Sequence, residues 1–334
     1  MKDVYILAIE SSCDETSFAI VKNGHEVVAL EITTQMNTHA IYGGVVPEIA
    51  SRMHTEAVTI CIEQLFSKTT LKIEDMNAVA VTYAPGLLGS LLVGVECAKT
   101  IAFLYKLPLI KVNHMAGHIY ANNIDNDMKY PLLALVISGG HTNLVKMTGD
   151  YEFEVLGRTL DDAIGEAYDK IARIMGIPYP GGPNIEKMAK EGNNTYQLPI
   201  PVNDNTYNFS FSGLKSYISN LVNNEKMHGN EIRKNDLARS FQDTVTDELI
   251  RKLKLALENT KIKNVIIAGG VSANGNIRNA VKELCDNYNA NLHVPKLVYC
   301  TDNAAMIGAA AYPLYIKKEF TTLDLNASAF DQIF

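Results

Sequence analysis

The sequence contains no tryptophan, few cysteines and no excess of basic side chains. Its five cysteines among 334 residues are scattered, odd in number and never spaced as Cys-x-x-Cys. This usage predicts reduced thiols in a cytoplasmic protein. Low-complexity segments are also absent, and a composition of 47% hydrophobic and 20% charged residues is that of an ordinary globular protein. The length allows two domains or one duplicated fold.

The formal net charge of −7 argues against a broadly basic surface for nucleic acid. Any contact with RNA would require a local basic patch or help from a partner. The N-terminal stretch MKDVYILAIESSCDE reaches acidic side chains too early for a signal-peptide core. No apolar run approaches the length of a membrane span, so we expect no membrane association.

A histidine pair stands out near the middle of the sequence. His114 and His118 are spaced i, i+4 in the helix-compatible run NHMAGHIY. On a helix this spacing places both imidazoles on one face, within reach of a single metal ion. The same pair on an apolar helix can also be structural, and the spacing alone leaves both interpretations open.

A glycine hairpin follows the histidines. The apolar run over residues 132–137 predicts a buried strand that ends at Ser138-Gly139-Gly140, and residues 142–147 predict a returning strand. Paired glycines at a strand end let the backbone approach a ligand closely and direct N–H groups at an anion. The histidine helix and this hairpin together predict a functional site.

Two parts of the sequence repeat one order of predicted elements. IESSCDETSFAIV and VISGGHTNLVKM each predict a strand, a polar tip and a second strand. Each is followed by another strand, a helix and later a strand–glycine–helix unit, which is VAVTYAPGLLGSLLVG in the first half and NVIIAGGVSANGNIR in the second. Sequence identity between the halves is negligible, so order and pattern alone predict a duplicated α/β fold with ligand held in the cleft between the halves.

Further helices are predicted in the second half. Asp161 or Asp162 can cap a helix with an apolar stripe. Residues 184–259 have mainly helical patterns and predict an inserted lobe. Cys300-Thr-Asp-Asn303 is expected to cap a last long helix over residues 304–317.

The sequence resembles a known family. The segments IESSCDET, YGGVVPEIASR, PGLLGSLLVG, NHMAGH, VISGGHT, DDAIGEAYDK, YPGGP, FSFSGLK, AGGVSAN and CTDNAAM occur in the order typical of the Kae/TsaD/YgjD family and cover nearly the whole chain. Its bacterial branch, TsaD, comprises the tRNA threonylcarbamoyladenosine transferases, once described as O-sialoglycoprotein endopeptidases. The resemblance implies the duplicated ribonuclease-H-like architecture of actin, sugar kinases and heat-shock chaperones, known as the ASKHA fold.

That architecture is an α/β fold with two lobes, a central cleft and a helical insertion in the second lobe. The first lobe is expected at residues 1–115 and the second at residues 116–320. The insertion is expected at about residues 184–259, and a C-terminal tail at residues 321–334.

The resemblance also implies site residues. His114, His118 and Asp302 would bind one divalent metal ion, iron or alternatively zinc, and leave coordination positions open for substrate oxygens. An adenylate substrate, or ATP or ADP, would contact Val136, Ile137, Ser138, Gly139, Gly140, Asp169, Gly182 and Asn274. Considered without the family, Asp169 can be a solvent-facing helix charge and the glycines plain turns.

No catalytic residue is assigned. Ser12, Asp14, Glu15 and His141 are expected around the reacting groups without defined roles. Glu186 stands where many family members have aspartate, which leaves its contact undefined.

The implied reaction is an acyl-type transfer. A threonylcarbamoyl group leaves threonylcarbamoyl-adenylate and passes to the exocyclic amine of the adenosine 3′ of the anticodon, in tRNAs that read codons beginning with A. The implied partners are a TsaB-like paralogue that dimerises through the first lobe, a TsaE-like ATPase and a separate synthase that supplies the adenylate. A local basic patch for tRNA would include Lys252, Lys254, Lys261 and Lys263.

Three other functions are less compatible with the sequence. A zincin metalloprotease needs His-Glu-x-x-His, but Met115 follows His114 and the spacer contains no base. An ASKHA kinase is permitted by the expected fold, but it does not need the histidine pair. A catalytically silent ATP-binding scaffold predicts loss of the pair and of the glycine turns, and both are present.

Overall fold

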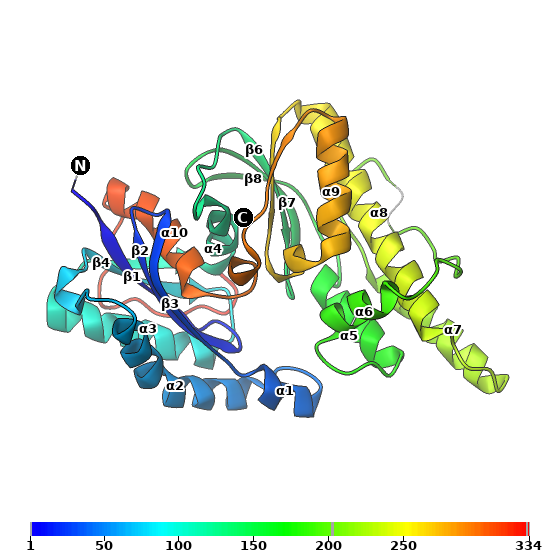
Figure 1. Cartoon of the computed structure of the whole chain (residues 1–334), viewed down its shortest axis with the longest axis horizontal. Coiled ribbons are helices and arrows are strands. Elements are labelled where there is room, and N and C mark those ends of the chain that lie inside the picture. Colours follow the sequence, from blue (N-terminus) through cyan, green and yellow to red (C-terminus); the bar gives the residue numbers. More distant parts are fainter. Residues whose placement is uncertain (1, 202–203, 332, 334) are drawn as a thin grey trace. The chain divides into compact units, whose positions relative to one another are not determined.

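The computed structural model describes residues 2–201, 204–331 and 333 (Figure 1). It contains two five-stranded mixed sheets, with strand orders β3-β2-β1-β4-β5 and β10-β9-β6-β7-β8. The strands of the first sheet are β1 (Tyr5–Glu10), β2 (Glu15–Lys22), β3 (Glu26–Thr34), β4 (Ala78–Ala84) and β5 (Leu109–Asn113). Those of the second are β6 (Leu132–Ile137), β7 (Thr142–Gly149), β8 (Glu152–Arg158), β9 (Asn264–Ala268) and β10 (Asn291–His293).

The second sheet repeats the topology of the first. In the first sheet β1, β2 and β3 form an antiparallel meander, and β4 and β5 are added parallel to β1. In the second sheet β6, β7 and β8 form the meander, and β9 and β10 are added parallel to β6. The helix α4 (His114–Tyr120) follows β5, and the helix α10 (Ala304–Lys317) later follows β10. The duplication inferred from element order is therefore confirmed.

The chain forms two compact units, Met1–Met128 with Pro295–Phe334, and Lys129–Val294. This division differs from the lobe boundaries expected after residues 115 and 320. The reason is that α4 and α10 pack against each other in the first unit. Gly117 allows this approach, because a Cβ there would lie 2.7 Å from the Cδ1 of Ile307.

Helices cover both faces of the first sheet. On one face α10 packs on β1 and β2 with Gly308 against Ala8 and Val21. On the other face the apolar core joins β1 and β4 to α2 (Pro47–Ser67) and α3 (Leu88–Tyr105). A short helix, α1 (Met36–Tyr42), precedes α2 and was not predicted from the sequence.

Among the described residues, α3 is the one helix long and apolar enough to cross a membrane by length and composition. This differs from the expectation that no apolar run reaches such a length. One face of α3 packs on α2 and β4 and contributes Leu91, Val95 and Ala98 to the buried residues. That packing accounts for part of its apolar composition.

The helices of the second unit share one apolar core with its sheet. They are α5 (Ile164–Ile174), α6 (Gly181–Ala189), α7 (Ser212–Met227), α8 (Lys234–Thr260) and α9 (Gly275–Asn287). The predicted cap of α5 is wrong, since Ala163 occupies the N-cap without a side-chain hydrogen bond. Asp161 instead accepts from the N–H groups of Phe211 and Ser212, at 2.8 and 3.2 Å, beside the start of α7. The N–H groups at the start of a neighbouring helix can satisfy such a carboxylate as well as those of its own helix can.

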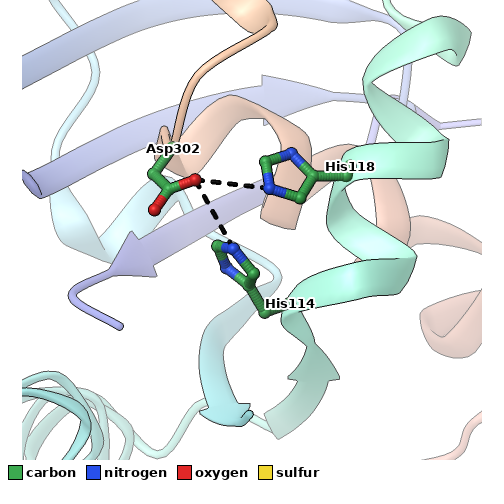
Figure 2. Close-up of side chains that lie close together, drawn as sticks. All are labelled: His114, His118 and Asp302. Carbon is green, nitrogen blue, oxygen red and sulfur yellow. Dashed lines mark ion pairs between the residues drawn. The ribbon is translucent and has the colours of Figure 1, made fainter. Parts of the chain in front are cut away.

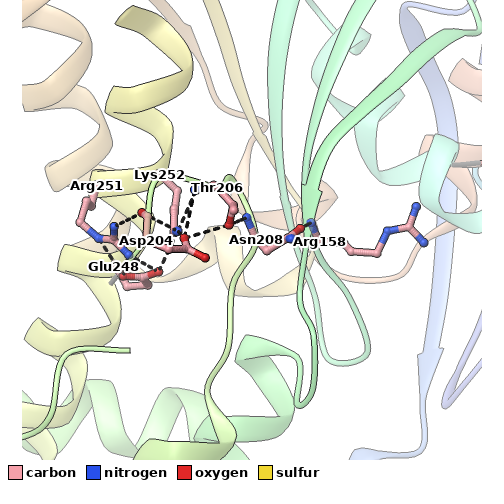
Figure 3. Close-up of polar contacts among 7 residues, drawn as sticks. All are labelled: Arg158, Asp204, Thr206, Asn208, Glu248, Arg251 and Lys252. Carbon is pink, nitrogen blue, oxygen red and sulfur yellow. Dashed lines mark hydrogen bonds and ion pairs between the residues drawn. The ribbon is translucent and has the colours of Figure 1, made fainter. Parts of the chain in front are cut away.

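Lys252 is buried on α8 and holds the loop that precedes α7 (Figure 3). Its side chain is 0% exposed, and its Nζ donates to Asp204 Oδ1 at 2.7 Å and to Thr206 O at 2.8 Å. The predicted role of Lys252 in a basic surface patch is therefore wrong. It lies on the core-facing stripe of α8 with Leu249 and Leu253, which sequence charge alone did not reveal. The other lysines of that expected patch are exposed: Lys254, Lys261 and Lys263.

We expect the two partners of this ion pair to differ in their effect on stability. Asp204→Asn removes the nearest charged partner of the buried ammonium of Lys252 and leaves only Glu248, which lies 4.0 Å away and is already paired with Arg251. Lys252→Met instead leaves a carboxylate of Asp204 that is 42% exposed and can be hydrated. Urea unfolding at pH 7 should therefore show a lower free energy of unfolding for Asp204→Asn than for Lys252→Met. Equal losses would contradict this account.

The same pair predicts a pH dependence. The hydrogen bond from Lys252 lowers the pKa of Asp204 to about 2, from an ordinary value of 3.8. The carboxylate therefore stabilises the fold above about pH 4, and this contribution is lost as pH falls toward 2. Asp204→Asn should flatten that part of the stability profile, while Asp286→Asn, which removes an exposed partner of Lys282, should not.

Candidate functional site

The histidine pair and Asp302 come together in the first unit (Figure 2). His114 begins α4 directly after β5, and Asn113 caps that helix by accepting from Met115 N at 2.9 Å. Asp302 immediately precedes Asn303, the N-cap of α10, as the sequence predicted for that cap. His114 and Asp302 thus lie at the starts of corresponding helices in the duplicated fold, and His118 lies one turn further along α4.

Their separations suit one bound cation. The Nε2 atoms of His114 and His118 lie 3.4 and 3.3 Å from Asp302 Oδ1, and the three ligand atoms all lie within 4.8 Å of one another. Metal–ligand bonds of about 2.0–2.2 Å place two ligands of one ion about 3–3.5 Å apart. The cluster therefore has the spacing of a two-histidine, one-carboxylate metal site.

The polar atoms of the cluster are not satisfied by protein groups alone. Both ring nitrogens of His118 are buried without a hydrogen bond of proper geometry among the described residues. Burial and the neighbouring His114 lower the pKa of His118, so its ring stays neutral and keeps a lone pair. Burial alone would raise the pKa of Asp302, but the adjacent imidazole of His114 lowers it well below its usual value. A neutral imidazole and a carboxylate are the forms that bind metal.

Some residues of the polar tip between β1 and β2 lie close to this cluster. Ser12 Oγ is 3.1 Å from His114 Nδ1. Burial and the charges of Asp302 and Asp14 raise the pKa of Glu15 to about 10, which places Glu15 in the same electrostatic environment. In the sequence Glu10 belongs to the segment IESSCDETSFAIV without a predicted role, yet it is the buried last residue of β1 and lies 3.1 Å from His114 Nδ1. A charged residue ending an apolar strand was the available signal.

The expected adenylate contacts lie in the second unit and start at its hairpin. Ser138 N donates to His141 O at 2.9 Å, and Ser138 Oγ accepts from His141 N at 3.1 Å, which closes the turn. Gly139 and Gly140 are exposed with open space where a Cβ would be. The side chains of Val136 and Ile137 are fully buried in β6. A substrate contact by those two residues would therefore use the main chain.

Close contacts join this hairpin to the first turn of α5 and to the end of β9. Gly165 N donates to Ser138 O at 3.2 Å, and a Cβ on Gly165 would lie 2.7 Å from that oxygen. Gly269, at φ +89°, leaves room for Ile137 O, which would lie 2.4 Å from a Cβ there. Glycine is required at both positions by this approach of main chain to main chain.

Three further side chains in this unit accept hydrogen bonds at the starts of helices, and they are those of Asp169, Glu186 and Asn274. Asp169 Oδ1 accepts from Gly181 N at 2.8 Å at the start of α6, and Gly182 next to it has open space at its Cα. Glu186 Oε1 accepts from Gly275 N at 3.1 Å at the start of α9. The contact of Glu186, which the sequence does not define, is thus a hydrogen bond that joins α6 to α9.

The side chain of Asn274 makes hydrogen bonds within the fold. Its Oδ1 accepts from the N–H groups of Asn276 and Ile277 at 3.0 and 3.1 Å, which caps α9. Its Nδ2 donates to Gln242 Oε1 at 3.2 Å. Substrate contact by Asn274 stays a prediction, and its capping role was not foreseen.

Comparison with known proteins identifies the family. Residues 26–309 match the family described as tRNA N6-adenosine threonylcarbamoyltransferase. The protein of that name from Bacillus subtilis is 50% identical over 327 residues, which cover 97% of this chain and 94% of the relative. This chain belongs to the tRNA N6-adenosine threonylcarbamoyltransferase family. It is therefore a transferase of tRNA modification, as the motifs predicted.

Another member of this family, from Staphylococcus haemolyticus, is 47% identical over 326 residues, which cover 97% of this chain and 95% of that protein. Solved structures with the same architecture include HypF of T. kodakarensis, with a TM-score of 0.64 at 15% identity over 97% of this chain and 49% of that one. Component A of (R)-2-hydroxyglutaryl-CoA dehydratase from Acidaminococcus fermentans has a TM-score of 0.56 at 16% identity, over 95% and 99% of the two chains. These likenesses concern the fold and confirm the expected ASKHA-type α/β architecture.

The capping role of Asn274 can be separated from substrate contact in this transferase. Asn274→Ala should lower the free energy of unfolding by about 0.5–2 kcal/mol through loss of the cap, whereas Asn274→Asp keeps a good capping oxygen. Asn274→Asp loses the donor to Gln242, but Gln242 can turn its amide and donate to the new carboxylate, so unfolding should stay closer to wild type than in Asn274→Ala. If the amide also contacts the adenylate, Asn274→Asp should weaken ADP binding in calorimetry. Unchanged ADP binding by Asn274→Asp would leave Asn274 with a structural role alone.

Proposed function

We propose that this transferase moves a threonylcarbamoyl group from threonylcarbamoyl-adenylate to the exocyclic amine of the adenosine 3′ of the anticodon. Its tRNA substrates would be those that read codons beginning with A. The observation that carries the metal part of this proposal is the cluster of His114, His118 and Asp302 in a member of this family. In the reaction the amine nitrogen bonds to the carbamoyl carbon and loses a proton, while the bond from that carbon to the phosphate oxygen breaks and releases AMP.

His114, His118 and Asp302 would hold one divalent metal ion, iron or zinc. A cation there would polarise the carbamoyl oxygen of the substrate. The buried, neutral ring of His118 and the ionised carboxylate of Asp302 support this role, because neither has to lose a proton to bind. Two histidines and one carboxylate also leave positions open for substrate.

The hairpin of the second unit would bind the adenylate, or ATP or ADP. Gly139 and Gly140 are exposed, and open space at the Cα of these two residues and of Gly182 supports close approach of a phosphate or sugar to the main chain. N–H groups at such a turn would stabilise charge on the departing phosphate. Asp169 would orient the start of α6 beside this ligand through its bond to Gly181.

Binding of tRNA would combine a single-stranded substrate with a local basic patch. The anticodon loop presents unpaired bases that can enter an active site without melting a duplex. The exposed side chains of Lys254, Lys261 and Lys263 support such a patch near the end of α8. A net charge of −7 makes a partner necessary for strong binding.

Three further proteins and a cytoplasmic location complete the proposal. A TsaB-like paralogue would dimerise through the first lobe, where the exposed apolar side chains of Met36, Ile41, Tyr42 and Ile60 on α1 and α2 offer a surface. A TsaE-like ATPase would join the complex, and a separate synthase would supply the adenylate. The complex would work in the cytoplasm without a membrane.

The proposal predicts the outcome of replacing a bacterial cell's own transferase with this chain. Mass spectrometry of tRNA nucleosides should show threonylcarbamoyladenosine restored by the wild type and by His228→Ala, whose imidazole is exposed and bonds its own helix. His114→Ala, at equal protein level, should restore none, because one of the three metal ligands is lost. Restoration by His114→Ala would refute the metal part of the proposal. Failure of the wild type even with its native partners supplied would refute the transfer itself.

A further inference from the structure

Glu10 is a carboxylate buried at the end of a core strand. It is the last residue of β1, and its relative exposure is 0%. A buried carboxylate is costly unless hydrogen-bond donors surround it. Its surroundings therefore indicate what it is retained to do.

Two donors hold the Glu10 carboxylate in place. Ser12 N donates to Oε1 at 2.6 Å, and Thr82 Oγ1 donates to Oε2 at 2.5 Å. Thr82 lies on β4, where Val81 pairs with Ile9, so Glu10 and Thr82 occupy neighbouring positions at the same end of two parallel strands. Bonds to main chain and to an adjacent strand leave the carboxylate little freedom to turn.

The third contact of Glu10 is with the first histidine of the cluster. Its Oε2 lies 3.1 Å from His114 Nδ1, while His114 Nε2 lies 3.4 Å from Asp302 Oδ1. The two nitrogens of one ring thus face two different carboxylates. A carboxylate only accepts hydrogen bonds, so without a metal ion each ring nitrogen of His114 directs a hydrogen at its own carboxylate. A cation held at Nε2 beside Asp302 would take the place of the hydrogen there, while Nδ1 would keep its hydrogen toward Glu10.

We propose that Glu10 is a positioning residue that fixes the tautomer and the ring orientation of His114 for metal binding. This inference rests on the metal site of the proposed function. Histidine ligands usually donate their second ring nitrogen to a carboxylate, a carbonyl or water, and removal of that acceptor typically weakens metal affinity about 10- to 100-fold. Glu10 supplies that acceptor from the buried end of a core strand.

The two histidines differ in this support. His118 Nδ1 is buried without a hydrogen-bond partner in the described part of the chain. Ser12 Oγ, also 3.1 Å from His114 Nδ1, is a second acceptor for the same ring. The contacts from residues outside the three metal ligands are therefore concentrated on His114, and Glu10 is the charged residue among them. Glu10 is not one of the three clustered ligands.

The test compares Co²⁺ binding by metal-free full-length chains, followed by visible absorption at one pH. Glu10→Gln keeps the size of the side chain but places an NH₂ group against surrounding donors, and we expect a dissociation constant about 10- to 100-fold higher than in the wild type. Ser11→Ala is the matched control, because it removes a buried hydrogen bond to Ser90 O in the same tip without touching His114. Its affinity should stay close to wild type.

Nitrogen NMR of ¹⁵N-histidine-labelled chain loaded with Zn²⁺ supplies a second readout. The ring signals of His114, assigned by their loss in His114→Ala, should report hydrogen on Nδ1 and metal on Nε2 in the wild type, and a mixture of the two tautomers in Glu10→Gln. If Glu10→Gln does not fold, Thr82→Val tests the same point, since it removes an anchor of the carboxylate and should weaken Co²⁺ binding and shift the tautomers to a smaller extent.

The outcomes separate this inference from the proposed function. Wild-type Co²⁺ affinity and tautomer in Glu10→Gln or Thr82→Val, with loss of binding in His114→Ala, would overturn the role of Glu10 and leave the metal site standing. Equal binding by the wild type and His114→Ala would refute the metal site itself, and the role of Glu10 with it. Weaker binding in Glu10→Gln but not in Ser11→Ala would support the inference.

Discussion

The close packing of α4 on α10 is the constraint on which the candidate metal centre depends. These helices start at corresponding points of the duplicated fold, and Gly117 lets them approach until Ile307 fills the space a side chain would need. The approach brings His114 and His118 beside Asp302, although nearly two hundred residues separate them in sequence. Without it the Nε2 atoms of both histidines would face no carboxylate, and only Glu10 would remain as an anionic neighbour of His114 among the described residues.

Much of this arrangement could be predicted from local sequence pattern. The i, i+4 spacing of His114 and His118 and the break of an apolar strand at Gly139-Gly140 are visible in short windows. Pairings across the fold are not visible there. Asp302 was predicted as a metal ligand only from the family resemblance. The core-facing position of Lys252 and the contact of Glu10 with His114 depend on which elements pack together.

Some of the expected substrate residues of the second unit also stabilise its helices. Asn274 and Asp169 use their side-chain oxygens to cap α9 and α6, and Glu186 ties these helices together. A substitution that lowers activity at these positions therefore changes helix geometry as well as ligand contact. A sequence motif at these positions can reflect helix capping, ligand contact or both, and only variants that preserve the cap distinguish the two roles.

The most direct test of the central claim is anomalous diffraction at the zinc absorption edge from crystals of the full chain soaked in Zn²⁺. The account predicts one ion within about 2.0–2.2 Å of His114 Nε2, His118 Nε2 and Asp302 Oδ1. The anomalous peak should vanish in His114→Ala. A strong peak elsewhere, with none between these three side chains, would contradict the account.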